Sequence, residues 1–280
     1  MMSAAGTWND LVLHEAPPLR DIGPFPSADI FFGATRSEAA FGGALGLAQG
    51  PSFKPEERAR IETLIKSQLI ENARKLSSKA ASSLEGVALS DYHKAVDDHD
   101  HGKLLSKLGR VLTKPAVDEI RQMSFFDYVR DAFGPYYLSD EENLGHEQIC
   151  FRIARPDRRE DVGSVHRDAW FWDHFGFPVP AGVNRAKAWV QVCGASSEAG
   201  LLLAPGSHRL PAGFSTETID GKLTFTPDVD LQTVNLHRFL GNPGDPIMFN
   251  YGVLHVGSLT RGETSRVSFE ITIMFRSEQA

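Results

Sequence analysis

The chain has 280 residues, of which 41% are hydrophobic and 23% are charged, proportions typical of a globular protein. Its formal net charge of -7 argues against nucleic acid as a partner, because phosphate binding needs a concentrated basic surface. No apolar run approaches the roughly 18 residues of a transmembrane helix, and no secretory leader is visible. We therefore expect a protein that binds neither nucleic acid nor membranes.

Chain length and cysteine content narrow the class further. All-β sandwiches and barrels of this size are commonly single domains, so we expect one domain over residues 1–280. The two cysteines, Cys150 and Cys193, lie in apolar stretches and indicate no disulfide framework. Unpaired, half-buried thiols suit a reducing compartment, so a cytoplasmic location is expected.

Residues 1–53 are rich in Gly, Pro and Ala, which predicts an arm or a set of loops. The segment has several aromatic side chains that indicate packing against the rest of the chain: Phe25, Phe31, Phe32, Phe41 and Phe53. Residues 55–76 have apolar side chains three and four positions apart, with proline and two glutamates at the start. This pattern predicts an amphipathic helix.

Further helices are expected over residues 90–112 and 115–133, which makes 54–134 a helical elaboration ahead of the core. Residues 97–101 read Asp-Asp-His-Asp-His and look like a metal cluster. Adjacent residues on a helix point in different directions, so we interpret this segment as a solvated face or loop.

From residue 147 the sequence is typical of β-structure, with short runs rich in β-branched and aromatic residues separated by turn residues. The predicted strands lie within 147–155, 185–193, 200–207, 222–227, 245–259 and 265–276. Helices first and strands later predict an α+β fold with a mainly β core over 147–276. The expected core is a double-stranded β-helix, the cupin-like jelly roll, braced by the N-terminal helices.

The motif His166-Arg167-Asp168 offers two metal ligands within three residues. On a strand, every second side chain points to the same face, so the imidazole and the carboxylate can reach one point. Such a motif also arises by chance at polar strand ends, so a third ligand is needed before it indicates a metal site.

His255 supplies that candidate third ligand. We expect it on a strand over 247–256, followed by a turn and by a strand from Ser265 whose polar face carries Arg266 and Ser268. His255 and Arg266 would then lie on adjacent arms of a hairpin. Two histidines and one carboxylate leave three iron positions open, two for a chelating 2-oxo acid and one for dioxygen. A guanidinium beside a hydroxyl suits the distal carboxylate of such a cosubstrate.

The order of these motifs resembles the phytanoyl-CoA dioxygenase family of Fe(II)/2-oxoglutarate oxygenases. The intervening stretch RAKAWVQVCGASSEAGLLLAPGSHR is also similar to the family's tryptophan-bearing strand and to its Pro-Gly-Ser-His segment. The resemblance covers roughly residues 115–276. It departs from many relatives at Cys193-Gly194-Ala195, where they have two acidic residues, and this puts the local loop geometry in doubt.

The resemblance implies that His166, Asp168 and His255 bind Fe(II) and form the catalytic centre. It also implies that Arg266 pairs with the far carboxylate of 2-oxoglutarate, with Ser268 assisting. Trp189 lies where the family often has an aromatic residue near the cosubstrate, although packing in the core explains it equally well. Related halogenases have a small residue in place of the carboxylate ligand, so an aspartate there favours hydroxylation.

The aromatic run Trp170-Phe171-Trp172 follows the ligands and is interpreted as a wall of the substrate site that excludes water. Its spacing is similar to the ectoine hydroxylase branch, but other signature residues differ, so ectoine is not the expected substrate. An amino acid, a compatible solute or a natural-product intermediate is expected instead. A basic groove for coenzyme A is disfavoured, because its candidate residues read as a solvated charged loop: Arg152, Arg155, Arg158 and Arg159.

Two other functions remain open from the sequence. The first is an iron oxygenase that uses dioxygen without 2-oxoglutarate, against which Arg266 and Ser268 weigh. The second is a non-catalytic jelly-roll protein whose aromatic run holds a ligand. The oligomeric state is left open.

Overall fold

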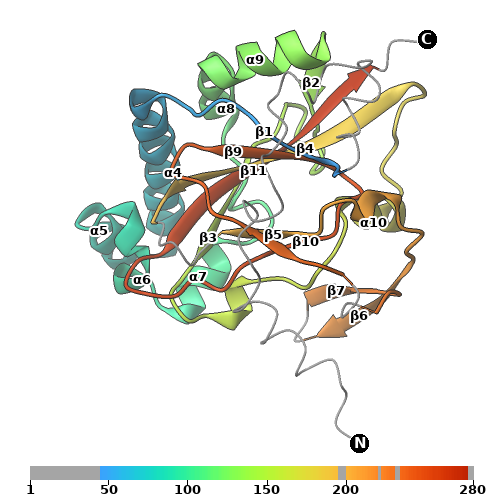
Figure 1. The fold of residues 1–280 in the computed structure, drawn as a ribbon. Coiled ribbons are helices and arrows are strands. Elements are labelled where there is room, and N and C mark those ends of the chain that lie inside the picture. The colour runs from blue at the N-terminus through green and yellow to red at the C-terminus, as the bar shows by residue number, and fades with distance from the viewer. Residues whose placement is uncertain (1–44, 195–199, 220–221, 231–233, 277–280) are drawn as a thin grey trace, which may run out of the picture.

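The computed structural model describes residues 45–194, 200–219, 222–230 and 234–276 (Figure 1). Its α-helices are α4 (Pro55–Leu76), α5 (Ser78–Glu85), α6 (Tyr92–Ala95), α7 (Asp98–Leu104), α8 (Lys114–Ile120), α9 (Ser124–Phe133) and α10 (Asp168–Phe175). Short 3-10 helices are η2 (Leu89–Asp91), η3 (Arg159–Asp161) and η4 (Ser207–Arg209). None of the helices within these ranges is long and apolar enough to cross a membrane.

The strands form three antiparallel sheets. The largest has six strands, in the order β1 (Leu47–Gln49), β9 (Pro246–Asn250), β4 (Val183–Cys193), β11 (Arg266–Arg276) and β2 (Tyr136–Leu138), with β3 (Cys150–Ala154) also paired to β11. A second sheet contains β10 (His255–Gly257), β5 (Leu201–Leu203) and β8 (His237–Phe239). A separate hairpin is formed by β6 (Phe214–Ile219) and β7 (Lys222–Pro227).

The two larger sheets pack face to face, and helices cover the outer face of the six-stranded sheet (Figure 1). Trp189 and Phe249 of the large sheet share a buried cluster with Leu203 and Phe239 of the small one. The rings of Trp189 and Phe239 have centroids 6.3 Å apart. The outer face has alternating apolar residues, such as Phe269, that pack with the helices. This is the predicted α+β arrangement, with helices bracing a jelly-roll core.

Helix α4 matches its predicted bounds. Pro55 occupies the first turn, and Glu57 accepts a hydrogen bond from the backbone N of Lys54 at 2.9 Å. Its buried face has Ile61 and Ile65 one turn apart, as an amphipathic helix requires. Glu57 also accepts hydrogen bonds from the backbone N and the hydroxyl of Ser124, at 2.8 and 2.7 Å, and thereby caps α9.

The two later helices were each predicted as one continuous helix, and both predictions were wrong because each segment forms two shorter helices. The segment 115–133 is split into α8 and α9, because α4 caps a new helix start at Ser124. The segment 90–112 is split into α6 and α7, because the carboxylate of Asp97 accepts from the backbone N of Asp100 at 2.9 Å and starts α7.

Residues 47–49, expected within an arm of loops, form β1 and pair with β9. Phe53 is buried against Phe125 and Phe269, as its predicted packing required. The other aromatic residues of that segment lie outside the described residues.

The predicted strand over 247–256 is interrupted, and the predicted hairpin is wrong. The side chain of Asn250 accepts from the backbone N of Gly252 at 2.8 Å, and this turn ends β9. The chain then crosses to the small sheet, where β10 pairs with β5. His255 and Arg266 therefore lie on facing sheets and not on adjacent arms of one hairpin.

Candidate metal centre

His166 and His255 are held together by their own backbones. The two residues form an isolated antiparallel bridge, in which the N of His166 donates to the O of His255 at 3.1 Å. The reverse hydrogen bond is 2.9 Å. The ring centroids lie 4.4 Å apart as a result.

Asp168 completes the group from the first position of α10. The strand assumed for the His-x-Asp motif is limited to the bridge at His166, because Asp168 already begins a helix. Arg167 between them is extended, with φ -112° and ψ 139°, and this keeps both side chains on one side. Nε2 of His255 lies 3.6 Å from Oδ2 of Asp168, and Nε2 of His166 lies 4.0 Å from Oδ1.

The outer nitrogen of each imidazole is already engaged. Nδ1 of His166 lies 2.8 Å from the carbonyl O of Ser164, and Nδ1 of His255 lies 2.9 Å from the carbonyl O of Val253. A carbonyl only accepts hydrogen bonds, so both Nδ1 atoms donate and both Nε2 lone pairs point inward.

The electrostatics also favour the protonation states that bind a metal, which are a neutral imidazole and an ionised carboxylate. Burial and the neighbouring His255 lower the pKa of His166 to about 4, which keeps the ring neutral. Burial opposes the charged form of Asp168, but the nearby charge of Lys187 favours it, and the pKa of the carboxyl lies below its usual value. Nζ of Lys187 lies 3.8 Å from Oδ1 of Asp168.

These donors fit a divalent metal. One donor atom from each of the three residues lies within 4.8 Å of the others, and no other such group of His, Cys, Asp or Glu occurs in the described residues. The buried Oδ2 of Asp168 has no hydrogen-bond partner within the described part of the chain. Two imidazoles and one carboxylate are the donor set of non-heme iron sites.

Arg266 lies on the inner face of β11 with its guanidinium buried. Nη1 donates to the carbonyl O of Ser258 at 3.1 Å and to the carbonyl O of Gly200. Its Nε has no partner among the described residues, and none of their carboxylates forms an ion pair with it. Burial and the charge of Arg152 lower the pKa of Arg266 to about 10. A buried cation of this kind favours binding of an anion.

Comparison with known proteins settles the family. The phytanoyl-CoA dioxygenase family matches residues 62–268. The chain belongs to the phytanoyl-CoA dioxygenase family. A search of curated protein sequences found no match.

Solved structures with the same fold include EctD from S. alaskensis. The crystal structure of EctD with 2-oxoglutarate and 5-hydroxyectoine has a TM-score of 0.52 at 15% identity, covering 92% of this chain and 82% of that one. The apo form of EctD has a TM-score of 0.50 at 16% identity, covering 86% and 76%. The predicted family and jelly-roll fold are confirmed, and membership of this family supports a non-heme iron oxygenase.

The remaining predicted site residues of this oxygenase lie at different distances from the triad. Ser268 is buried and pairs with Gln191 on β4. Trp189 is buried in the inter-sheet cluster, and its ring centroid lies 5.8 Å from Cζ of Arg266. Trp189 therefore packs in the core and also lies beside Arg266, as the two interpretations of this residue require.

The aromatic run divides into three environments. Phe171 lies beside the triad, with its ring centroid 5.3 Å from that of His166. Trp170 is buried against Phe214, with ring centroids 5.3 Å apart, in a second apolar cluster that includes Leu202 of the small sheet. Trp172 lies under the guanidinium of Arg185, with Cζ 4.5 Å from the ring centroid.

Sequence reasoning placed Glu270 on the polar face of the last strand, but it missed the cations that join Glu270 on the inner face of the large sheet. Lys187 and Glu270 line this face, and Arg152 joins them from β3. Lys187 donates to the hydroxyl of Thr272 at 3.2 Å, and that hydroxyl donates to Glu141 at 2.7 Å. The signal was present in RAKAWVQVC, where polar side chains alternate with small apolar ones.

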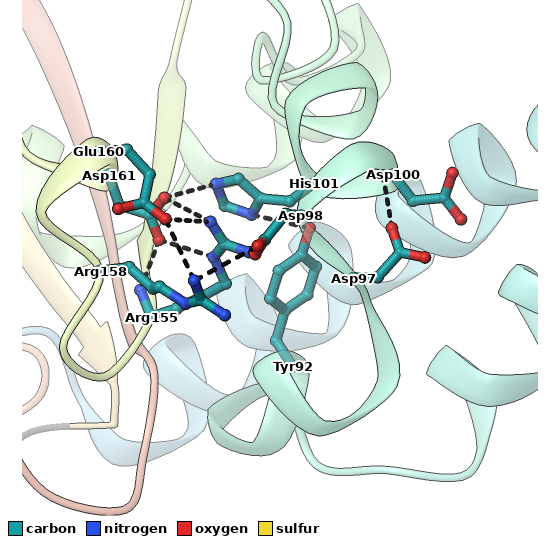
Figure 2. Close-up of polar contacts among 9 residues, drawn as sticks. All are labelled: Tyr92, Asp97, Asp98, Asp100, His101, Arg155, Arg158, Glu160 and Asp161. Atoms are coloured by element: carbon teal, nitrogen blue, oxygen red, sulfur yellow. Dashed lines mark hydrogen bonds and ion pairs between the residues drawn. The ribbon is translucent and has the colours of Figure 1, made fainter.

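The segment 97–101 was interpreted as a solvated face or loop, but part of it is buried in a network of polar contacts. His101 is buried, and its Nε2 lies 3.1 Å from Oδ1 of Asp161, while its Nδ1 lies 3.2 Å from the hydroxyl of Tyr92 (Figure 2). Arg155 donates to both oxygens of Asp161 at 2.8 Å, and to Asp98 at 2.6 Å. The network joins α7 to the loop that leads to His166.

The prediction of a solvated arginine loop therefore holds only in part. Arg155 is a buried member of this network, with its side chain 4% exposed, whereas that of Arg158 is 47% exposed. Arg152 lies on strand β3 and not in a loop.

Proposed function

We propose that this chain is an Fe(II)- and 2-oxoglutarate-dependent dioxygenase, a single domain that hydroxylates a C–H bond of a small metabolite. The observation that carries the proposal is the buried guanidinium of Arg266, which has no carboxylate partner among the described residues. It lies on the inner face of the same jelly roll as the His166–Asp168–His255 group.

Each part of the site has a task in this reaction. His166, Asp168 and His255 would hold the iron, which supplies activation of dioxygen when bound. Arg266 would bind the distal carboxylate of 2-oxoglutarate, with Ser268 beside it on the same strand face. The balanced reaction converts substrate, dioxygen and 2-oxoglutarate into hydroxylated substrate, succinate and carbon dioxide.

The protein's own groups prepare the site for this reaction. Ser164 and Val253 fix the orientation of the two imidazoles through their carbonyls. Lys187 keeps Asp168 ionised and therefore able to bind metal. Phe171 lies edge-on to His166 and helps exclude water from the reacting face. We propose that Trp170 and Trp172 support this wall as part of the substrate site.

The cosubstrate is the finer part of the proposal. The similarity in fold to EctD, whose crystal structure contains 2-oxoglutarate, supports it. The alternative, an iron oxygenase that does not consume 2-oxoglutarate, leaves the unpaired charge of Arg266 without a purpose. A non-catalytic binding protein leaves the inward-facing Nε2 atoms of His166 and His255 unexplained.

The test is iron- and oxygen-dependent conversion of 2-oxoglutarate to succinate. Arg266→Ala should raise the KM for 2-oxoglutarate by about 10- to 100-fold, the loss of a charge-assisted hydrogen bond. Its Fe(II) affinity should stay within about twofold, because the hydrogen bonds of Arg266 go to the backbone carbonyls of Ser258 and Gly200 and not to the three ligand side chains. Arg276→Ala, at the exposed end of the same strand, is the matched control. Equal losses of iron and cosubstrate affinity would contradict the assignment, and so would activity without 2-oxoglutarate.

A further inference from the structure

The inner face of the large sheet carries two arginines besides Arg266, the buried Arg185 on β4 and the more exposed Arg152 on β3. In the register of β3 and β11, Arg152 lies opposite Ser268. The neighbours of Arg152 on β3, Phe151 and Ile153, point to the other face and are buried against the helices. Because side chains alternate along a strand, Arg152 projects into the space between the sheets, on the same side as Ser268.

The guanidinium of Arg152 is only partly used. Its Nε and Nη2 lie 3.0 and 2.8 Å from the same oxygen of Glu270, so the pair is not a two-oxygen fork. Within the described ranges, Glu270 is the only hydrogen-bond partner of this guanidinium. The Arg152 side chain is 48% exposed, whereas Glu270 is 17% exposed. An edge of the guanidinium therefore remains available to a ligand.

The position of Arg152 ties that edge to the reaction site. Ser268, which lies opposite Arg152, is two residues from Arg266 on the same face of β11, and Glu270, which accepts from Arg152, is two residues further along that face. The inner-face cations of β4 are Arg185 and Lys187, and both are buried. Lys187 is paired with Asp168, and the guanidinium of Arg185 lies over the rings of Trp172 and Tyr251. Among the four inner-face cations of the described residues, Arg152 is the one that a molecule entering from solvent can reach.

An apolar surface lies beside His166. The ring of Phe171 is edge-on to His166, and it packs against Phe225 with centroids 4.2 Å apart. Phe171 is partly exposed, while Phe225 is fully buried behind it. The surroundings of the triad therefore offer a bound molecule both an aromatic surface, at Phe171, and an accessible cation, at Arg152.

We propose that Arg152 binds a carboxylate of the organic substrate, so that the substrate class is small carboxylic acids with an apolar body. A planar carboxylate matches the free edge of a guanidinium, and Glu270 holds that guanidinium in place. Arg266 is retained for the cosubstrate. This inference rests on the proposed function, since it assigns the substrate of the same site.

The test compares acids with their neutral amides on the full chain loaded anaerobically with Fe(II) and 2-oxoglutarate. The probes are hexanoate, 3-phenylpropanoate and their primary amides, titrated by calorimetry. At least one acid should bind wild type about 10-fold or more tightly than its amide. Arg152→Gln should remove this preference while the Kd for 2-oxoglutarate stays within about twofold. Arg158→Gln, which changes an equally exposed arginine on the following loop, should keep the preference.

Two further variants separate recognition from folding. Arg152→Gln leaves Glu270 without its partner, so the double variant Arg152→Gln/Glu270→Gln removes both charges together. It should fold with a melting temperature near wild type and show no preference for acids. Arg152→Lys keeps the charge without the planar fork and should retain part of the preference.

The possible failures are distinguishable. No preference for any acid over its amide in wild type would overturn the substrate assignment alone. A loss of 2-oxoglutarate affinity in Arg152→Gln would also overturn it, because the arginine would then serve the cosubstrate. Absence of Fe(II) and 2-oxoglutarate binding by wild type would overturn the proposed function and this inference together.

Discussion

Replacing Asp161 by asparagine tests whether the network in Figure 2 holds the ligand loop in place. The Asp161 side chain is 1% exposed and that of its partner Arg155 is 4% exposed. Asp161 also accepts from the backbone N of Arg155 at 2.9 Å, and lies 3.1 Å from His101. Asparagine keeps the shape but removes the charge, which leaves a buried guanidinium matched only by the exposed carboxylates of Asp98 and, at 3.6 Å, Glu160.

The expected loss of folding stability in Asp161→Asn is large for a single substitution that preserves shape. Breaking one side of a buried ion pair costs about 3–5 kcal/mol. At roughly 2–4 °C per kcal/mol for a chain of this size, the melting temperature should fall by about 10 °C. Glu160→Gln is the matched control, because Glu160 is 51% exposed and 3.6 Å from Arg155. That substitution should change the free energy of unfolding by less than about 0.5 kcal/mol.

The pH dependence gives a second readout. Burial opposes ionisation of Asp161, but the hydrogen bonds from Arg155 and His101 outweigh it and hold the pKa well below its usual value. The stabilisation is therefore fully present above the unfolded pKa of about 4 and is lost as pH falls below it. Wild type should lose stability faster than Asp161→Asn on acidification below about pH 4. Equal melting temperatures for Asp161→Asn and Glu160→Gln would refute this reasoning. So would a loss of stability below about pH 4 that is the same in wild type and in Asp161→Asn.

Two other substitutions test separate contacts. Lys187→Met removes the cation 3.8 Å from Asp168, which should raise the pKa of that carboxyl. Fe(II) binding should then be lost at a higher pH on acidification than in wild type. Anaerobic titrations in which both proteins lose Fe(II) at the same pH would contradict this. Gly194→Ala should cost more than about 3 kcal/mol in urea unfolding, because its Cβ would lie 1.6 Å from the carbonyl O of Ser265 at φ +72°. Gly182→Ala, at φ +73° with open space, should cost only about 1 kcal/mol, and equal costs would show that the clash is relieved.

The ligand group could be predicted from the sequence because its chemistry is local. His166 and Asp168 are two residues apart, and an extended Arg167 is enough to bring their side chains together. His255 was found from its residue type and from its order before Arg266. The reasoning that joined them was wrong in detail, since a backbone bridge and not a hairpin brings His255 to the site.

The errors share a physical cause, which is that tertiary contacts decide where elements end. The start of α9 depends on Glu57 of a distant helix, and no local pattern encodes that cap. The end of β9 depends on the side chain of Asn250 closing a turn, whereas the apolar pattern continues without a break. Arg152 fell within the predicted strand over 147–155 but was grouped with a solvated arginine loop, because its place on the inner face depends on the register of β3 against β11.

Anaerobic titration with Fe(II) tests the central claim most directly. Wild type should bind one equivalent with a micromolar or lower Kd. His166→Ala and His255→Ala should each weaken binding by more than about 100-fold, since even outer-shell partners of a metal cost 10- to 100-fold. His99→Ala, which changes an exposed histidine of α7, should bind as wild type does. An intact protein that binds no Fe(II), or binding that survives loss of both His166 and His255, would contradict the account.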